Sequence, residues 1–185
     1  MADTNFINNI LFWVVQSLGI FALVFYGLSF QAKTKENLLI MQVISNIFST
    51  VQFILTAAVT GAVQTMLGVL RGIVFYFYKK RGLNPDKIVL AVFEIAIILG
   101  AVLTWGGILS VFPLVGMTAN LYGQWQNDMK LIKIFAIISA VLWSVYALYT
   151  GVYTAMLTEL LKIVSSVVGL VRFKKIEKGG ENQNG

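Results

Sequence analysis

Polar and apolar positions occur along this chain in long blocks. Apolar runs of about 20 residues, the length of a helix that crosses a bilayer core, recur along nearly the whole sequence. Set against the polar breaks, these runs predict seven helices, at 8–30, 38–59, 62–78, 88–105, 108–124, 131–149 and 152–172. The predicted fold class is therefore an all-α integral membrane protein with seven transmembrane helices.

The breaks between the runs are of two kinds. Three are long and charged, at 31–37, 79–87 and 124–130, and three are tight and uncharged, at Thr60-Gly61, Gly106-Gly107 and Thr150-Gly151. Loops rich in Lys and Arg stay on the cytoplasmic side of a membrane. Twelve of the fourteen cations flank alternate breaks or the C-terminus, and they are Lys33, Lys35, Lys79, Lys80, Arg81, Lys87, Lys130, Lys133, Arg172, Lys174, Lys175 and Lys178. This distribution predicts the N-terminus outside, the C-terminus inside, and two separate helices within 88–124.

The two halves of the chain also resemble each other. A shift of 90 residues aligns Thr60-Gly61 with Thr150-Gly151, and it aligns Ser49 with Ser139. Two three-helix units of the same orientation need an extra helix between them, because three crossings leave the chain on the wrong side. We therefore predict a 3+1+3 plan of two parallel repeats joined by an inversion helix, with a first repeat at 8–78, a linker helix at 88–105, a second repeat at 108–172 and a cytoplasmic tail at 173–185.

The composition limits which partners the protein can bind and which catalytic groups it can use. The chain is 58% hydrophobic and 12% charged with a mean hydropathy of +0.81, so the expected partner is the lipid bilayer. The cations lie in short clusters beside apolar segments, which does not favour a nucleic-acid surface. Because the sequence has no Cys and no His, thiolate chemistry, the usual zinc sites and imidazole catalysis are excluded. We expect no metal, no cofactor and no enzymatic activity.

Four ionisable residues fall within the predicted helices, namely Arg71, Glu94, Glu159 and Lys162. A charge at bilayer depth is costly unless it is paired or hydrated, so we expect a buried charge network. In a functional interpretation, Arg71 and Glu159 are the poles of a solute or proton site, where the cation holds a carboxylate or polarises a hydroxylated solute. In a structural interpretation, Glu159 and Lys162 neutralise each other and Arg71 pairs with Glu94 or Glu159, which braces the bundle without any ligand.

Uncharged side chains add further candidates. The substrate-binding candidates are Asn46, Asn120 and Trp143, and Gln42 and Gln52 are further amides inside predicted helices. Each amide could instead bond helix to helix, and Trp143 could stack on a ring-shaped solute or simply pack. Pro113 removes a backbone donor near the start of 108–124, where it is either a hinge or a helix start.

Several segments in order carry a family resemblance. They are Gln16-Ser-Leu-Gly-Ile-Phe-Ala-Leu, Gly61-Ala62, Leu70-Arg71-Gly72, Pro113-Leu-Val-Gly116, Leu142-Trp143, Thr150-Gly151, Glu159 and Val171-Arg172-Phe173. In these segments the chain resembles the YgjV-type bacterial inner membrane proteins, which implies an inner membrane location and assigns no activity.

The 3+1+3 plan is also similar to that of the SWEET and PQ-loop transporters, in which a solute binds between two bundles. The chain departs from that pattern because it has no Pro-Gln dipeptide, has only Pro113 where a pair of prolines is expected, and lacks a matched asparagine pair in the third and seventh helices.

The sequence thus leaves two functions open. The first is a small-solute transporter that rocks two three-helix bundles about a midplane site at Arg71 and Glu159, with a small polar solute as partner. The second is a non-transporting structural or regulatory multi-pass protein, which predicts a closed interior without a polar cavity. Nothing in the sequence indicates an oligomeric state.

Overall fold

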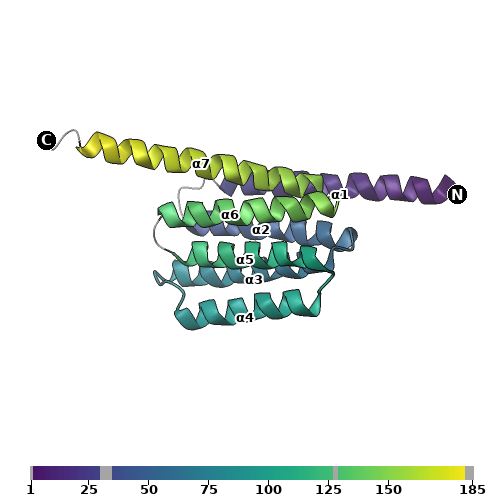
Figure 1. Cartoon of the computed structure of the whole chain (residues 1–185), viewed down its shortest axis with the longest axis horizontal. Coiled ribbons are helices and arrows are strands. Elements are labelled where there is room, and N and C mark those ends of the chain that lie inside the picture. Colours follow the sequence, from purple (N-terminus) through teal and green to yellow (C-terminus); the bar gives the residue numbers. More distant parts are fainter. Residues whose placement is uncertain (1, 30–34, 127–128, 182–185) are drawn as a thin grey trace.

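The computed structural model describes residues 2–29, 35–126 and 129–181, with side chains for 9–29, 36–126 and 130–171. Within these residues it is entirely helical (Figure 1). The elements are α1 (Ala2–Ser29), α2 (Lys35–Leu55), α3 (Val59–Lys80), α4 (Lys87–Leu103), the short 3-10 helix η1 (Ile108–Ser110), α5 (Val111–Trp125), α6 (Met129–Tyr149) and α7 (Tyr153–Glu181). The predicted all-α fold is confirmed, including two separate helices between 88 and 124.

The helices form two layers of three. Figure 1 shows α5, α6 and α7 in front of α3, α2 and α1. At the edges of the layers α1 packs against α7 and α3 against α5, whereas the middle helices α2 and α6 make few direct contacts with each other. The α4 helix packs along α3 and α5, outside the two layers. Two parallel repeats around an axis along the helices would be arranged in this way, and the 3+1+3 division itself stays a prediction.

The turns that precede α3 and α7 are built alike. In each, a threonine hydroxyl, of Thr56 or Thr150, donates to the carbonyl four residues earlier, and the next residue, Ala57 or Gly151, has a positive φ of 54° or 73°. The predicted turn at Thr60-Gly61 is therefore wrong, because both residues lie within α3. The two similar turns are 94 residues apart, so the shift of 90 does not match the turns.

Charged and uncharged connections lie at opposite ends of the bundle. The N-terminus of α1 and the C-terminus of α7 are at opposite ends (Figure 1), and successive helices run in opposite directions. The connection at 81–86 therefore lies at the end where α7 finishes, with Lys79, Lys80, Arg81, Lys87, Lys130 and Lys133 near it. The side chains of the other predicted cytoplasmic cations, Lys33, Lys35, Arg172, Lys174, Lys175 and Lys178, lie outside the described residues. The orientation relative to the membrane stays a prediction.

The outer surface suits a bilayer. In the described chain five helices, α1, α2, α3, α6 and α7, are long and apolar enough to cross a membrane. The α4 and α5 helices have 17 and 15 residues. At about 1.5 Å per residue they are shorter than a bilayer core. Large apolar side chains such as Ile88 and Leu103 are 76% and 82% exposed, whereas Gln52 and Gln64 are fully buried. Apolar groups outside and polar groups inside define a membrane protein.

Some element ends differ from the predictions. The α7 helix continues to Glu181 instead of ending near 172, so most of the predicted tail is helical. Pro113 is the third residue of α5, where the missing N–H is one that a first turn leaves without a partner anyway. Its position favours the helix-start interpretation of this proline.

Candidate functional site

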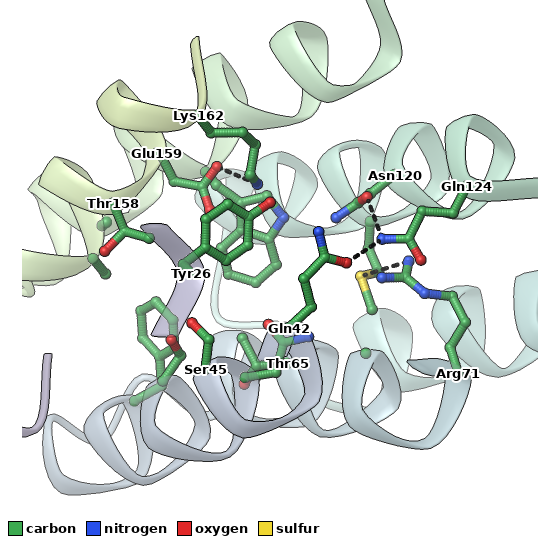
Figure 2. A pocket seen from close by; sticks show the side chains of 18 residues that line it. Tyr26, Gln42, Ser45, Thr65, Arg71, Asn120, Gln124, Thr158, Glu159 and Lys162 are labelled. Carbon is green, nitrogen blue, oxygen red and sulfur yellow. Dashed lines mark hydrogen bonds and ion pairs between the residues drawn. The ribbon is translucent and has the colours of Figure 1, made fainter. Parts of the chain in front are cut away.

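A polar cavity lies between the two layers, where α2 and α6 stand apart. Every α-helix except α4 contributes side chains to it, and its volume is about 50 Å³ (Figure 2). Arg71 and Lys162 lie near the middle of α3 and α7, so the cavity is at mid-bundle depth. The predicted substrate-binding residues Arg71, Glu159, Trp143, Asn46 and Asn120 all line this cavity.

One face of α2 supplies much of the lining. Counted from Gln42, the lining residues Ser45, Asn46, Ser49 and Phe53 are three, four, seven and eleven positions further on, which places all five on one side of a helix. The first four of these residues are polar, and between them the helix is apolar. Polar residues along one side of a membrane helix indicate that this side faces a polar cavity and not lipid.

An ion pair lies on the α7 side of the cavity. Lys162 Nζ is 2.5 Å from Glu159 Oε2, and the two side chains are 4% and 16% exposed. The ring of Tyr26, from α1, lies beside them with its centroid 5.1 Å from Lys162 Nζ. The predicted mutual neutralisation of Glu159 and Lys162 is confirmed.

Arg71 occupies the other side, without a carboxylate partner. It is 2% exposed, its Nη1 group contacts the Met117 sulfur at 3.8 Å, and its Nε has no hydrogen-bond partner. Within the described part of the chain it forms no ion pair with Glu94 or Glu159, so the predicted pairings of Arg71 are wrong. A buried guanidinium with this environment is costly unless water or an anion compensates it.

Glu94 does not belong to the cavity. It accepts a hydrogen bond of 2.8 Å from Thr118 Oγ1 and faces a largely apolar groove between α4, α5 and α6. The predicted four-residue charge network is thus divided into a Glu159–Lys162 pair, an Arg71 without an anion, and a Glu94 elsewhere.

Three amides connect the layers near Arg71. Gln124 Nε2, on α5, donates to Gln42 Oε1 on α2 at 3.2 Å and to Asn120 Oδ1 at 3.1 Å. In Figure 2 these side chains and Arg71 lie together, across the cavity from Glu159 and Lys162. The Gln42–Gln124 bond closes the gap between α2 and α5 toward the charged end of the bundle, since Gln124 is next to the last residue of α5.

Aromatic rings close the opposite end. The ring centroids of Phe53, Trp143 and Tyr146 are 5.7 to 6.0 Å apart, and the Tyr146 hydroxyl accepts a 3.0 Å bond from the Gly61 N–H. A Cβ at Gly61 would lie 2.7 Å from the Tyr146 ring, so the glycine permits this approach. Trp143 therefore both packs and lines the cavity.

Three more polar residues, Gln52, Tyr26 and Gln124, differ in whether they line the cavity. Gln52 bonds helix to helix, because its Nε2 donates to Val15 O and Thr154 Oγ1 at 2.8 Å each. Tyr26 and Gln124 also line the cavity, and neither was predicted from the sequence. Both are near predicted helix ends, where a tyrosine indicates a membrane interface and a glutamine indicates a loop. Gln124 is four residues after Asn120, which places both on the same side of a helix, and this spacing could have identified Gln124 as a lining residue.

These observations define a multi-pass, all-helical membrane protein with a polar cavity between its two helix layers. The sequence comparisons place it further: the model of the Imp-YgjV family, described as a bacterial inner membrane protein, matches residues 13–177. The chain therefore belongs to this family, and it is located in the bacterial inner membrane. No curated protein and no solved structure matches the chain. The likeness to the SWEET and PQ-loop transporters stays a prediction.

Proposed function

We propose that this protein is a small-solute transporter of the inner membrane that works by alternating access between two three-helix bundles. The bundles are α1–α3 and α5–α7, and the cavity between them is the solute site. The proposed activity is binding and movement of a solute without chemical conversion.

The observation that carries the proposal is the cavity itself. Polar and charged side chains inside a membrane are expensive, and where they line a shared cavity they mark pathways. Here Asn46, Arg71, Asn120 and Glu159 come from four different helices of both layers to one space at mid-bundle depth. A structural brace would need these groups to satisfy one another, and Arg71 lacks such a partner in the described chain.

The two closures of the cavity fit alternating access. The aromatic cluster of Phe53, Trp143 and Tyr146 joins α2 to α6 near the end with uncharged turns, and the Gln42–Gln124 bond joins α2 to α5 near the charged end. Both closures join one layer to the other, so a rocking motion that parts the layers at one end opens that end alone. The structure then corresponds to an occluded state.

The alternative is a non-transporting structural or regulatory membrane protein. The small volume of the cavity, about 50 Å³, favours it, because ligand pockets usually enclose about 300 to 1,000 Å³. The Glu159–Lys162 pair also behaves as the structural interpretation expects. In that case the interior is permanently closed.

Thiol labelling distinguishes the two functions without knowledge of the solute. The chain has no cysteine, so Ser49→Cys, in the cavity lining, is a unique reactive site. We expect a membrane-impermeant thiol reagent to modify Ser49→Cys both in right-side-out and in inverted membrane vesicles. The control is Val92→Cys on α4, which is 59% exposed on the apolar outer surface and should stay unmodified.

Labelling from both sides supports alternating access. If Ser49→Cys reacts from neither side, or from one side only, the transporter proposal is overturned and the closed-interior alternative replaces it. Denaturation of the vesicles in detergent before labelling verifies that the thiol is reactive.

A further inference from the structure

We propose that the solute site binds a small monovalent anion, a carboxylate group or a halide, with Arg71 as the fixed cation and the side-chain amides of Gln42 and Asn120 as additional donors. This inference rests on the proposed function and names the chemistry of that same site.

Charge is the first argument. The Glu159–Lys162 pair is neutral as a unit and Glu94 is in another groove, so the charge left over in the cavity is the positive charge of Arg71. Arg71 is 2% exposed, and within the described residues its hydrogen-bond contact is with the sulfur of Met117 and it forms no ion pair. A buried cation in this state stabilises any anion that reaches it, because the low dielectric strengthens their attraction.

Two side-chain amides of the lining, those of Gln42 and Asn120, favour the same sign of charge. The side-chain oxygens of Gln42 and Asn120 are both engaged by Gln124 Nε2, at 3.2 and 3.1 Å. What these two amides still offer to the cavity is therefore their NH₂ groups, which can only donate. In Figure 2 both amide nitrogens point into the middle of the cavity, between Arg71 and Lys162. A ligand that meets donors on these sides must be an acceptor.

Size limits the ligand. An engineered cavity of about 150 Å³ holds one benzene molecule. A cavity of about 50 Å³ in the occluded state therefore has room for two or three non-hydrogen atoms. A halide or a carboxylate group fits this space, and the planar fork of an arginine matches the two oxygens of a carboxylate. Larger carboxylates would need further space from the movement of the layers.

The inference is tested by thermal unfolding of the full-length protein in detergent at constant ionic strength. The sodium salt of 2-morpholinoethanesulfonic acid, a bulky anion with neither a carboxylate nor a halide, is replaced stepwise by sodium formate, acetate or chloride. Acetamide and methylammonium chloride are the neutral and cationic counterparts. A ligand that binds only the folded state raises the unfolding temperature, and the rise grows with the logarithm of its concentration.

The variants separate the site from general charge effects. We expect at least one of the three anions to stabilise the parent and Lys87→Gln, which removes the same charge from the bundle end, but not Arg71→Gln. Acetamide should leave the unfolding temperature unchanged. Methylammonium chloride should change it only as much as sodium chloride does at the same chloride concentration. If Arg71→Gln does not fold, Gln42→Met is the second variant, because it keeps the charge of Arg71 and removes one hydrogen-bond donor. It should raise the anion concentration needed for the same increase in unfolding temperature about tenfold, since this corresponds to the loss of one hydrogen bond to a charged group. The preferred anion distinguishes a carboxylate from a halide.

Two results overturn the inference: no anion stabilises the parent, or Arg71→Gln and Gln42→Met respond as the parent does. The labelling of Ser49→Cys makes this failure distinguishable from failure of the proposed function. Labelling from both sides without an anion effect leaves a transporter for another solute, and an anion effect without labelling from both sides leaves an anion-binding protein that does not transport.

Discussion

The contact between α1 and α7 depends on the absence of a side chain at Gly19. A Cβ at this position would overlap the Thr154 hydroxyl and the Gln52 amide, which are hydrogen-bonded to each other. Gly19→Ala therefore has to push α1 away from α7 and α2, whereas Gly27→Ala, two turns further along α1, meets nothing within 4 Å. The two substitutions add the same methyl group to the same helix.

The magnitudes follow from this geometry. Overpacking costs about 1 to 3 kcal/mol, and loss of the Gln52–Thr154 bond costs about 0.5 to 1.5 kcal/mol more. Replacement of a helical glycine by alanine returns about 0.5 to 1 kcal/mol in both variants. We expect Gly19→Ala to lower the free energy of unfolding by about 1 to 3 kcal/mol, and Gly27→Ala to leave it unchanged or raise it slightly.

The assay is reversible unfolding by SDS titration in mixed micelles, followed by circular dichroism, on both variants and the parent. A Gly19→Ala variant as stable as Gly27→Ala would refute the close contact of α1 with α7, and with it the closed edge of the two layers.

Three further predictions concern other contacts, each measured by the same titration. Glu159→Gln should destabilise by about 3 kcal/mol because it leaves Lys162 buried without its partner, and adding Lys162→Met should restore most of the loss; an additive double variant would contradict the pairing. Tyr146→Phe should cost about 1 kcal/mol, the value of its bond from a glycine N–H in α3, and no loss would argue against that bond. Thr118→Val should cost a similar amount by removing a donor to Glu94 while leaving the anion response intact, since this carboxylate lies outside the cavity.

Depth along the helix axis was predictable from the sequence, but helix neighbours were not. The sequence placed Arg71 and Glu159 together at a midplane site, and both side chains line the cavity. Their predicted pairing failed because α3 lies beside α5, whereas α7 lies beside α1 at the other edge of the layers. Glu94 has a suitable depth as well, but the side of α4 on which it lies faces a different groove.

Turn positions were misplaced for a local reason. Gly61 was assigned to a turn as part of an uncharged break between two apolar runs, whereas its role is to allow the Tyr146 ring to approach α3. The residue that adopts the positive φ is Ala57, which has no sequence signal for it. The number of helices was predictable because it depends on long apolar runs. Which small residue, Ala57 or Gly61, adopts the turn conformation depends on tertiary contacts and was not predictable.

The position of α4 makes the two edges of the bundle unequal. This helix covers the edge where α3 meets α5, whereas no other described helix packs extensively over the edge where α1 meets α7. Lipid acyl chains therefore reach only the second edge directly. In the proposed transport cycle, a parting of the layers at this edge would exchange contact between α1 and α7 for contact with lipid, whereas α4 would keep the other edge covered.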